Sequence, residues 1–302
     1  MQVAFHQIFE KPTTPAAQVL YHVRATPRVS RGELVKATGL SQPTITRAVI
    51  ALSNAGLVQE RRDLINTARP GRPVVPLELT AWPGLLIGIA VDVHDCLIGC
   101  YDFRGRLLRE VRVKETAPPH SVPDVLEYII AAIHRIKNEF PIPLRAISLG
   151  CASPEWTELS WIKSRLEFEF NVPAMACSAA ASIALAEIQQ NRAQENVFVL
   201  FSENSVSAAW ITENGVTSTA QQFSEADWLD YIISGPKPSS IIFSGANFFD
   251  PQRRAPIRTR LQTELGTEVP LRVTRPELET LRTISAALAL SPMQSDPLAL
   301  AR

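Results

Sequence analysis

The chain has 302 residues, 46% of them hydrophobic and 20% charged, and its 30 Lys/Arg balance 30 Asp/Glu. This length predicts about two domains, and this composition is ordinary for a globular protein with a substantial core. A membrane-spanning chain is excluded, because the longest apolar run, residues 85–91, is too short to cross a bilayer. No basic and apolar leader precedes the first predicted helix, so we expect a cytoplasmic protein without membrane contact.

The overall balance of charge hides an asymmetry. Residues 1–80 contain ten Lys/Arg and five Asp/Glu, a net charge of +5, so the rest of the chain carries −5. A basic N-terminal part suits a polyanionic partner such as double-stranded DNA. The four cysteines form neither a CxxC pair nor a zinc spacing, and we expect reduced, mostly buried thiols and no metal or cofactor. They are Cys96, Cys100, Cys151 and Cys177.

The first 14 residues have little periodicity and are expected to form an arm. Pro15 begins a predicted helix that ends near residue 25. Its inward stripe supports the segment that follows and consists of Ala16, Val19, Leu20 and Val23.

Residues 30–57 have the form of a helix-turn-helix. A short helix over residues 31–38 is broken by Gly39, and Ser41 caps a second helix that runs to about residue 54. The second helix carries an apolar stripe for packing, formed by Ile45, Ala48, Val49 and Leu52. Its N-terminal end and opposite face present the side chains that we expect to contact DNA: Ser41, Gln42, Pro43, Thr44, Thr46 and Arg47. The alternative is an ordinary helical hairpin inside a core.

A two-stranded wing is predicted directly after the helix-turn-helix. Residues 57–62 and 74–79 read as strands, and the tight basic segment 70–73 lies between them. We expect the loop residues Arg69, Gly71 and Arg72 to reach phosphates or a minor groove, with Arg31 close to the DNA backbone. The alternative for each arginine is a solvated surface cation.

The remainder of the chain alternates between strand and helix patterns after an initial run of hairpins, which indicates an α/β domain. The predicted strands cover residues 85–93, 97–103, 107–113, 144–150, 172–176, 196–201, 205–211 and 241–243. The predicted helices cover residues 125–140, 161–170, 178–190, 251–265 and 276–290.

On these residues the chain resembles the ROK family, which contains bacterial sugar kinases and related repressors. The family's N-terminal pattern is present as Ser30, Arg31, Glu33, Leu34, Thr38, Gly39, Leu40, Ser41, Pro43, Thr44, Ile45, Thr46, Arg47, Leu52, Gly56, Leu57 and Val58. The Gly-Arg-Pro of the wing is present as Gly71, Arg72 and Pro73. The resemblance implies a winged helix-turn-helix followed by a ROK-like, actin/hexokinase-type (ribonuclease H-like) α/β domain in two lobes.

The catalytic residues of the family are missing from the matching positions. Ala90 stands where the kinases have a phosphate-contacting Asp, and Ser178 stands where they have the general base. The later phosphate loop, residues 201–205, has no glycine, and the family's zinc element is absent from the sequence. Phosphoryl transfer needs a metal-binding carboxylate and a phosphate cradle, so the resemblance implies a shortened, degenerate and catalytically inactive domain.

Other polar groups are candidates for small ligands. Glu155, Ser178 and Asn204 are the residues that we expect to line a ligand cleft between the two lobes. Trp156 and Trp161 would stack on a sugar beside Glu155, but core packing and helix capping are the favoured explanation for these three residues. A metal site at Asp92, His94 and Asp95 is a weaker hypothesis than a solvated hairpin edge.

Together these observations predict two domains, a winged helix-turn-helix over residues 1–80 and a dimerisation or sensor domain over residues 81–302. The predicted function is that of a DNA-binding transcriptional repressor acting as a homodimer or higher homo-oligomer. A small-molecule-responsive sensor is the second hypothesis, and a sugar kinase the third.

Overall fold

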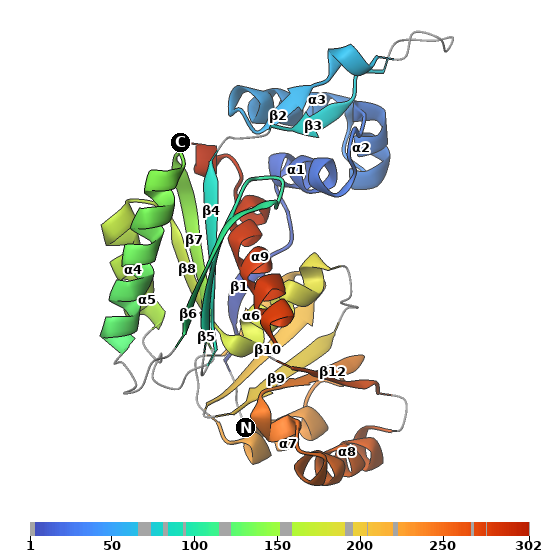
Figure 1. The fold of residues 1–302 in the computed structure, drawn as a ribbon. Coiled ribbons are helices and arrows are strands. Elements are labelled where there is room, and N and C mark those ends of the chain that lie inside the picture. The colour runs from blue at the N-terminus through green and yellow to red at the C-terminus, as the bar shows by residue number, and fades with distance from the viewer. Residues whose placement is uncertain are drawn as a thin grey trace.

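In a computed structural model the chain has the fold drawn in Figure 1. The structure describes residues 4–65, 74–80, 84–92, 95–114, 122–151, 159–190, 196–203, 205–219, 223–266, 269–275 and 277–301. Two parts are distinguished below. The head comprises the helices and strands within residues 15–79, and the body comprises the strand at residues 6–10 and every element from residue 85 onward. No helix within the described ranges is long and apolar enough to span a bilayer.

The head is a three-helix unit with a small antiparallel sheet. Its helices are α1 (Pro15–Ala25), α2 (Arg31–Thr38) and α3 (Gln42–Asn54), and its strands are β2 (Val58–Glu60) and β3 (Leu77–Leu79). Ser30 and Glu33 form a capping box at the start of α2, and Gly39 ends that helix in the left-handed region at φ 70°. The strands are shorter than predicted because residues 62–64 form a 3-10 turn and residues 74–76 lie outside β3.

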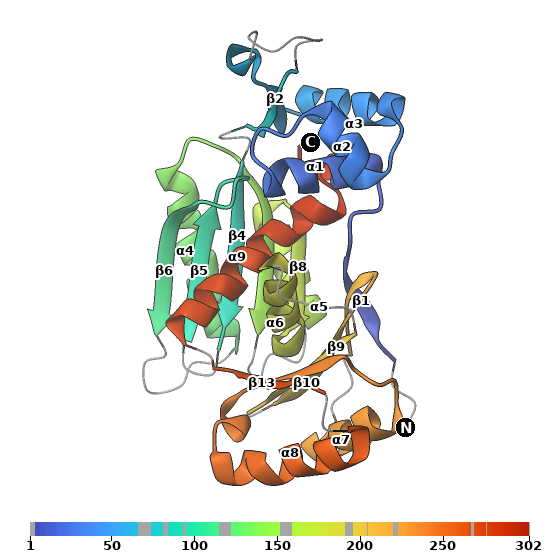
Figure 2. The ribbon, with the colours of Figure 1, turned by 90° about the vertical axis from the view of Figure 1, so that its right-hand side faces the viewer.

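The first lobe of the body is a five-stranded sheet in the order β6-β5-β4-β7-β8. Its strands are β4 (Leu85–Val91), β5 (Asp95–Tyr101), β6 (Leu107–Lys114), β7 (Leu144–Cys151) and β8 (Ala174–Ser178). Helices α4 (Val122–Glu139) and α5 (Leu159–Phe170) cover one face, while α6 (Ala179–Gln189) and α9 (Leu278–Ser295) lie on the other (Figures 1 and 2). Residues of β4 alternate between these faces, which explains its continuous apolar run.

The second lobe is a six-stranded sheet in the order β1-β11-β10-β9-β12-β13. Its strands are β1 (His6–Glu10), β9 (Val197–Ser202), β10 (Val206–Thr212), β11 (Gly215–Ser218), β12 (Ser240–Ser244) and β13 (Leu271–Thr274). Helices α7 (Glu225–Ser234) and α8 (Pro251–Leu265) pack on one face and α6 on the other. Val199 and Phe201 face α6, whereas Phe198 and Leu200 belong to the cluster with α7 and α8.

The N-terminal segment differs from its prediction. Residues 1–14 were expected to be an arm, but β1 is an edge strand that pairs with β11 of the second lobe, with Gln7 opposite Thr217. Phe9 of this strand is 3% exposed and belongs to the core around α6. Hydrophobic burial at a sheet edge therefore ordered a segment too short to show a clear period. Among the described residues, the strands β11 and β13 and the helix α7 were not predicted from the sequence, and α9 extends five residues beyond its predicted end at residue 290.

Head and body share one hydrophobic cluster. Leu20 and Leu52 of the head lie in the same cluster as Leu86, Leu290 and Met293 of the body. Figure 2 shows α9 crossing the first lobe and ending beneath α1. The junction is therefore a packed interface rather than a bare linker, although the predicted boundary near residue 80 falls between β3 and β4.

The four cysteines are buried and free, as predicted. Burial raises the pKa of the Cys96 and Cys100 thiols to about 12, so both are neutral near pH 7. The expectation that Trp161 packs in the core was wrong, because Trp161 lies 42% exposed on α5; Trp156 lies outside the described residues.

Candidate nucleic-acid interface

Helix α3 is positioned by its apolar stripe. Ile45, Ala48, Val49 and Leu52 are all buried against the head core, as their spacing predicted. Ser41 caps the helix, and its hydroxyl accepts a hydrogen bond from the Thr44 backbone N–H (3.4 Å). Burying one stripe turns the other side of α3 toward solvent, so the first turn and the polar face are available to a partner.

The polar face of α3 has graded accessibility. Ser41, Gln42, Pro43 and Arg47 are exposed, whereas Thr44 and Thr46 are half-buried. The Thr46 hydroxyl donates to the Gln42 carbonyl (3.0 Å), and the hydroxyls of Ser41 and Thr44 are 2.9 Å apart. Each hydroxyl oxygen can still accept a hydrogen bond from a ligand, and these contacts within the helix fix its orientation. This end of α3 is therefore an ordered polar surface before any ligand arrives.

Arg47 is the one arginine of α3. Its side chain is exposed, and it has neither a hydrogen-bond nor an ion-pair partner among the residues that the structure describes. A guanidinium carries five N–H donors and pairs in bidentate fashion with guanine or with phosphate. Arg47 thus combines the chemistry and the accessibility that a DNA contact needs.

Arg31 is held differently. Its guanidinium is 2.6 Å from the carboxylate of Glu60, and its side chain is only 24% exposed. Arg62 contacts the same carboxylate at 3.1 Å. The hydrogen bond from Arg31 is the main cause that lowers the pKa of Glu60. Arg31 therefore links the start of α2 to β2, and only part of its fork is accessible to a phosphate.

The base of the wing is a network of paired charges. Strands β2 and β3 pair antiparallel with Gln59 opposite Glu78. Arg61 forms ion pairs with Asp63 and with Glu78, so its charge is neutralised within the head. The predicted wing contacts Arg69, Gly71 and Arg72 belong to residues 66–73, outside the described residues.

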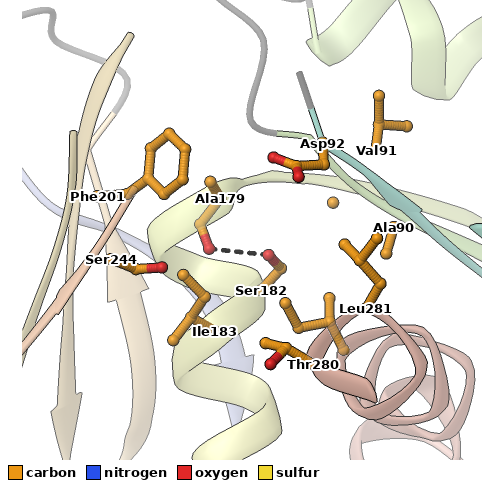
Figure 3. Close-up of a pocket in the computed structure, with 12 residues that line it drawn as sticks. Ala90, Val91, Asp92, Ala179, Ser182, Ile183, Phe201, Ser244, Thr280 and Leu281 are labelled. Atoms are coloured by element: carbon orange, nitrogen blue, oxygen red, sulfur yellow. Dashed lines mark hydrogen bonds between the residues drawn. The ribbon is translucent and has the colours of Figure 1, made fainter. Parts of the chain in front are cut away.

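The cleft between the two lobes is the predicted ligand site of the body. Figure 3 shows it lined by Ala90, Asp92, Ser182, Phe201 and Leu281, among others. Its volume is about 20 Å³, room for about one water, whereas ligand pockets measure about 300–1,000 Å³. The Ser182 hydroxyl donates to the Ala179 carbonyl of its own helix at 2.8 Å. Small apolar side chains and helix α9 thus fill the cleft.

Only one of the three residues predicted as ligand contacts lies within the described part of the chain. Ser178 caps α6, with its hydroxyl accepting from the Ala181 N–H and lying 2.9 Å from the Ser218 hydroxyl. Glu155 and Asn204 lie outside the described residues. Asp95 of the hypothetical metal group is ion-paired with Arg112 across the hairpin, which fits the solvated-edge interpretation; His94 is outside the described ranges. Three or more potential metal ligands do not cluster anywhere in the described part.

Sequence reasoning missed one group of polar residues at the junction of head and body. Arg24 of α1, Gln189 of α6 and Gln294 of α9 line a common cavity there. Their separation along the chain offered no signal, because only the packing of α1 on α9 brings them together.

Comparison with known proteins supports the winged helix and the two-lobed body. Residues 12–64 match the MarR family model. Transcriptional regulators of Mycobacterium bovis and Mycobacterium tuberculosis are 39% identical to the chain over 106 residues, which make up 35% of this chain. The chain spans only 24% of the length of these curated relatives.

Two solved structures match the chain to different extents. A ROK family transcriptional regulator, described as a homologue of the Escherichia coli Mlc protein, matches with a TM-score of 0.69 and 13% identity, over 95% of this chain and 97% of that one. A ROK hexokinase from Thermus thermophilus matches with a TM-score of 0.48 and 15% identity, over 67% of this chain and 98% of that one. The first match confirms the predicted fold class, a winged helix-turn-helix followed by a ROK-like α/β body.

Proposed function

We propose that the chain is a DNA-binding transcriptional regulator and acts as a repressor. The observation that carries this proposal is the exposed polar end of α3. Its buried stripe holds this end at the surface of a winged helix, together with Arg47, which pairs with none of the described residues. Gln42, Thr44 and Thr46 would read base edges in a major groove, with Arg47 on guanine or phosphate. Ser41 and Pro43 would lie at the DNA backbone, and Arg31 would sit near it. Arg69, Gly71 and Arg72 would contact the DNA from the wing.

The test begins with DNA fragments that the wild-type protein selects from genomic DNA. Arg47→Ala is expected to weaken binding to a selected fragment by about 1–3 kcal/mol, or about 5- to 150-fold, because a bidentate contact is lost. Arg135→Ala removes the same charge from the exposed face of α4 and is expected to leave affinity unchanged. Equal affinities of wild type and Arg47→Ala in fluorescence anisotropy would remove Arg47 from the interface.

The body is proposed to dimerise the protein and to be catalytically inactive. A homodimer would present two α3 helices to half-sites about 34 Å apart, or a multiple of that distance. Inactivity is supported by the volume of the interlobe cleft, about 20 Å³, and by Ala90 within it. Incubation with ATP and a panel of hexoses is expected to give no sugar phosphate; turnover that Ser178→Ala abolishes would show that the body is a kinase.

A sensory role is the second candidate function. The filled interlobe cleft does not favour a ligand at Ser178, whose hydroxyl is already engaged with Ser218 and with α6. A roomier cavity at the junction of head and body supports sensing at another place, and its chemistry is developed below.

A further inference from the structure

A cavity of about 450 Å³ lies where the head rests on the body. Four segments line it: α1 with Tyr21 and Arg24, the β5–β6 turn with Arg104, the end of α6 with Gln189, and α9 with Leu290 and Gln294. Its volume is within the range of small-molecule sites, which are often found between domains. It is more than an order of magnitude larger than the interlobe cleft.

The cavity is positively charged. Arg24 and Arg104 are its charged lining residues, and the lining contains no carboxylate among the described residues. Arg104 donates from Nε and Nη2 to the Leu79 carbonyl of β3 (3.1 and 2.6 Å), and its Nη2 is 3.8 Å from Glu78. The positive charge of Arg104 is therefore partly compensated by the Leu79 carbonyl and the Glu78 carboxylate, which both belong to β3.

Arg24 lacks such compensation. Its one hydrogen bond in the described structure goes to the neutral amide oxygen of Gln189 (2.5 Å), and no carboxylate of the described ranges lies within ion-pair distance. Burial lowers the pKa of Arg24 from its ordinary value, which expresses the cost of desolvating the cation. A half-buried guanidinium that faces a cavity without a counter-charge is a ready partner for an anion.

Gln294 adds unused hydrogen-bonding capacity to the same cavity. It is 3% exposed, and neither its amide oxygen nor its amide nitrogen has a partner within the described part of the chain. Buried amides of this kind are rare in folded proteins, and each needs a reason to be kept. Leu290 and Ala286 on the same helix, with Tyr21 opposite, supply an apolar surface beside these polar groups.

We infer that this junction cavity binds a small organic anion, a carboxylate or phosphate ester with an apolar body, whose charge is met by Arg24 and Arg104 and whose remaining polar atoms are met by the Gln294 amide. The Arg24–Gln189 hydrogen bond joins α1 of the head to α6 of the body. An anion that pairs with Arg24 competes with this hydrogen bond. Anion binding is therefore coupled to the contact between α1 of the head and α6 of the body.

The test uses the full chain and three probes: benzoate, phenyl phosphate and benzamide, the last being a neutral analogue of benzoate. In calorimetric titration at least one of the two anions is expected to bind at millimolar concentrations or below, and which one binds distinguishes a carboxylate site from a phosphate site. Benzamide is expected to bind at least about tenfold more weakly. Failure of both anions, or equal binding of benzamide, overturns the inference.

Variants locate the site. Arg24→Gln is expected to reduce affinity for the bound anion by about 10- to 100-fold, while Arg135→Gln, which removes the same charge from α4, leaves it unchanged. Gln294→Met is expected to weaken anion binding and to raise the melting temperature of the ligand-free protein by about 2–4 °C, because unpaired amide groups are replaced by an apolar side chain.

A lower melting temperature for Gln294→Met would assign that amide a structural role and contradict its part in the site. Unchanged anion affinity in Arg24→Gln would place the ligand elsewhere and overturn the inference. None of these measurements needs DNA, so they are independent of the proposed function.

Discussion

Gly88 allows α9 to lie directly against strand β4. A Cβ atom at this position would stand 1.8 Å from the Ser285 carbonyl oxygen and 2.9 Å from the Ala289 nitrogen of α9. The Ser285 hydroxyl donates to the Gly88 carbonyl (2.8 Å), which ties helix to strand at the same point. The observed role of Gly88 is therefore close backbone packing between strand and helix.

Gly88→Ala is expected to destabilise the protein by about 1–3 kcal/mol or more, because both neighbours of the new methyl group are backbone atoms. Gly32→Ala is the matched control. Gly32 lies in the first turn of α2 and a Cβ there has nothing closer than the Ser30 hydroxyl at 4.0 Å, so this change is expected to stabilise by about 0.5–1 kcal/mol. Equilibrium denaturation in urea measures both, and equal effects would mean that α9 does not pack as described.

At the scale of elements, strand β1 links the N-terminal side of the head to the second lobe of the body. It precedes the head in sequence, yet it pairs with β11 and buries Phe9 beneath α6. From β1 the chain continues upward through residues 11–14 to begin α1 (Figure 2). The head is therefore attached to the body on both sides, by β1 before it and by β4 after it.

Phe9→Ala is expected to destabilise the body by about 3–5 kcal/mol, the range for truncating a buried aromatic side chain. The sequence contains no Trp within residues 1–80, so tryptophan fluorescence reports unfolding of the body. Phe168→Ala makes the same chemical change at a side chain that is 85% exposed and should shift the transition little. A body transition that is insensitive to Phe9→Ala would mean that β1 does not dock in solution.

At the scale of the whole molecule, head and body are coupled by packing and by polar contacts. Met293 of α9 is 2% exposed in the cluster that also holds the core of the head. Arg104 of the body donates to the Leu79 carbonyl of the head, and Arg24 of the head donates to Gln189 of the body. Separating head from body would therefore expose the shared apolar cluster and break both hydrogen bonds.

We expect head and body to unfold in one cooperative transition, because separating them would expose the shared cluster. Hydrogen exchange of the α1 and α3 peptides should lose protection at the same urea concentration at which tryptophan fluorescence changes. Earlier loss of protection in α1 and α3 would show that the junction is weaker than its packing indicates.

The sequence by itself determined what depends on neighbours along the chain. The stripe of α3, the capping of α2 by Ser30 and the turn at Gly39 follow from local spacing and backbone conformation, so the helix-turn-helix was predicted nearly to the residue. The hairpin of β4 with β5 and the helix–strand alternation of the body were readable for the same reason.

Only the tertiary structure decided which distant segments meet. The docking of β1 on β11, the filling of the interlobe cleft by α9 and the junction cavity at Arg24 and Gln294 all arise from contacts between residues far apart in sequence. Hydrophobic burial is non-directional. A periodic pattern of apolar residues therefore indicates that one face of a helix or strand is buried, but it does not indicate which other element buries it. The charge of Arg24 was visible in the sequence, but that no described carboxylate pairs with it is a property of the folded junction.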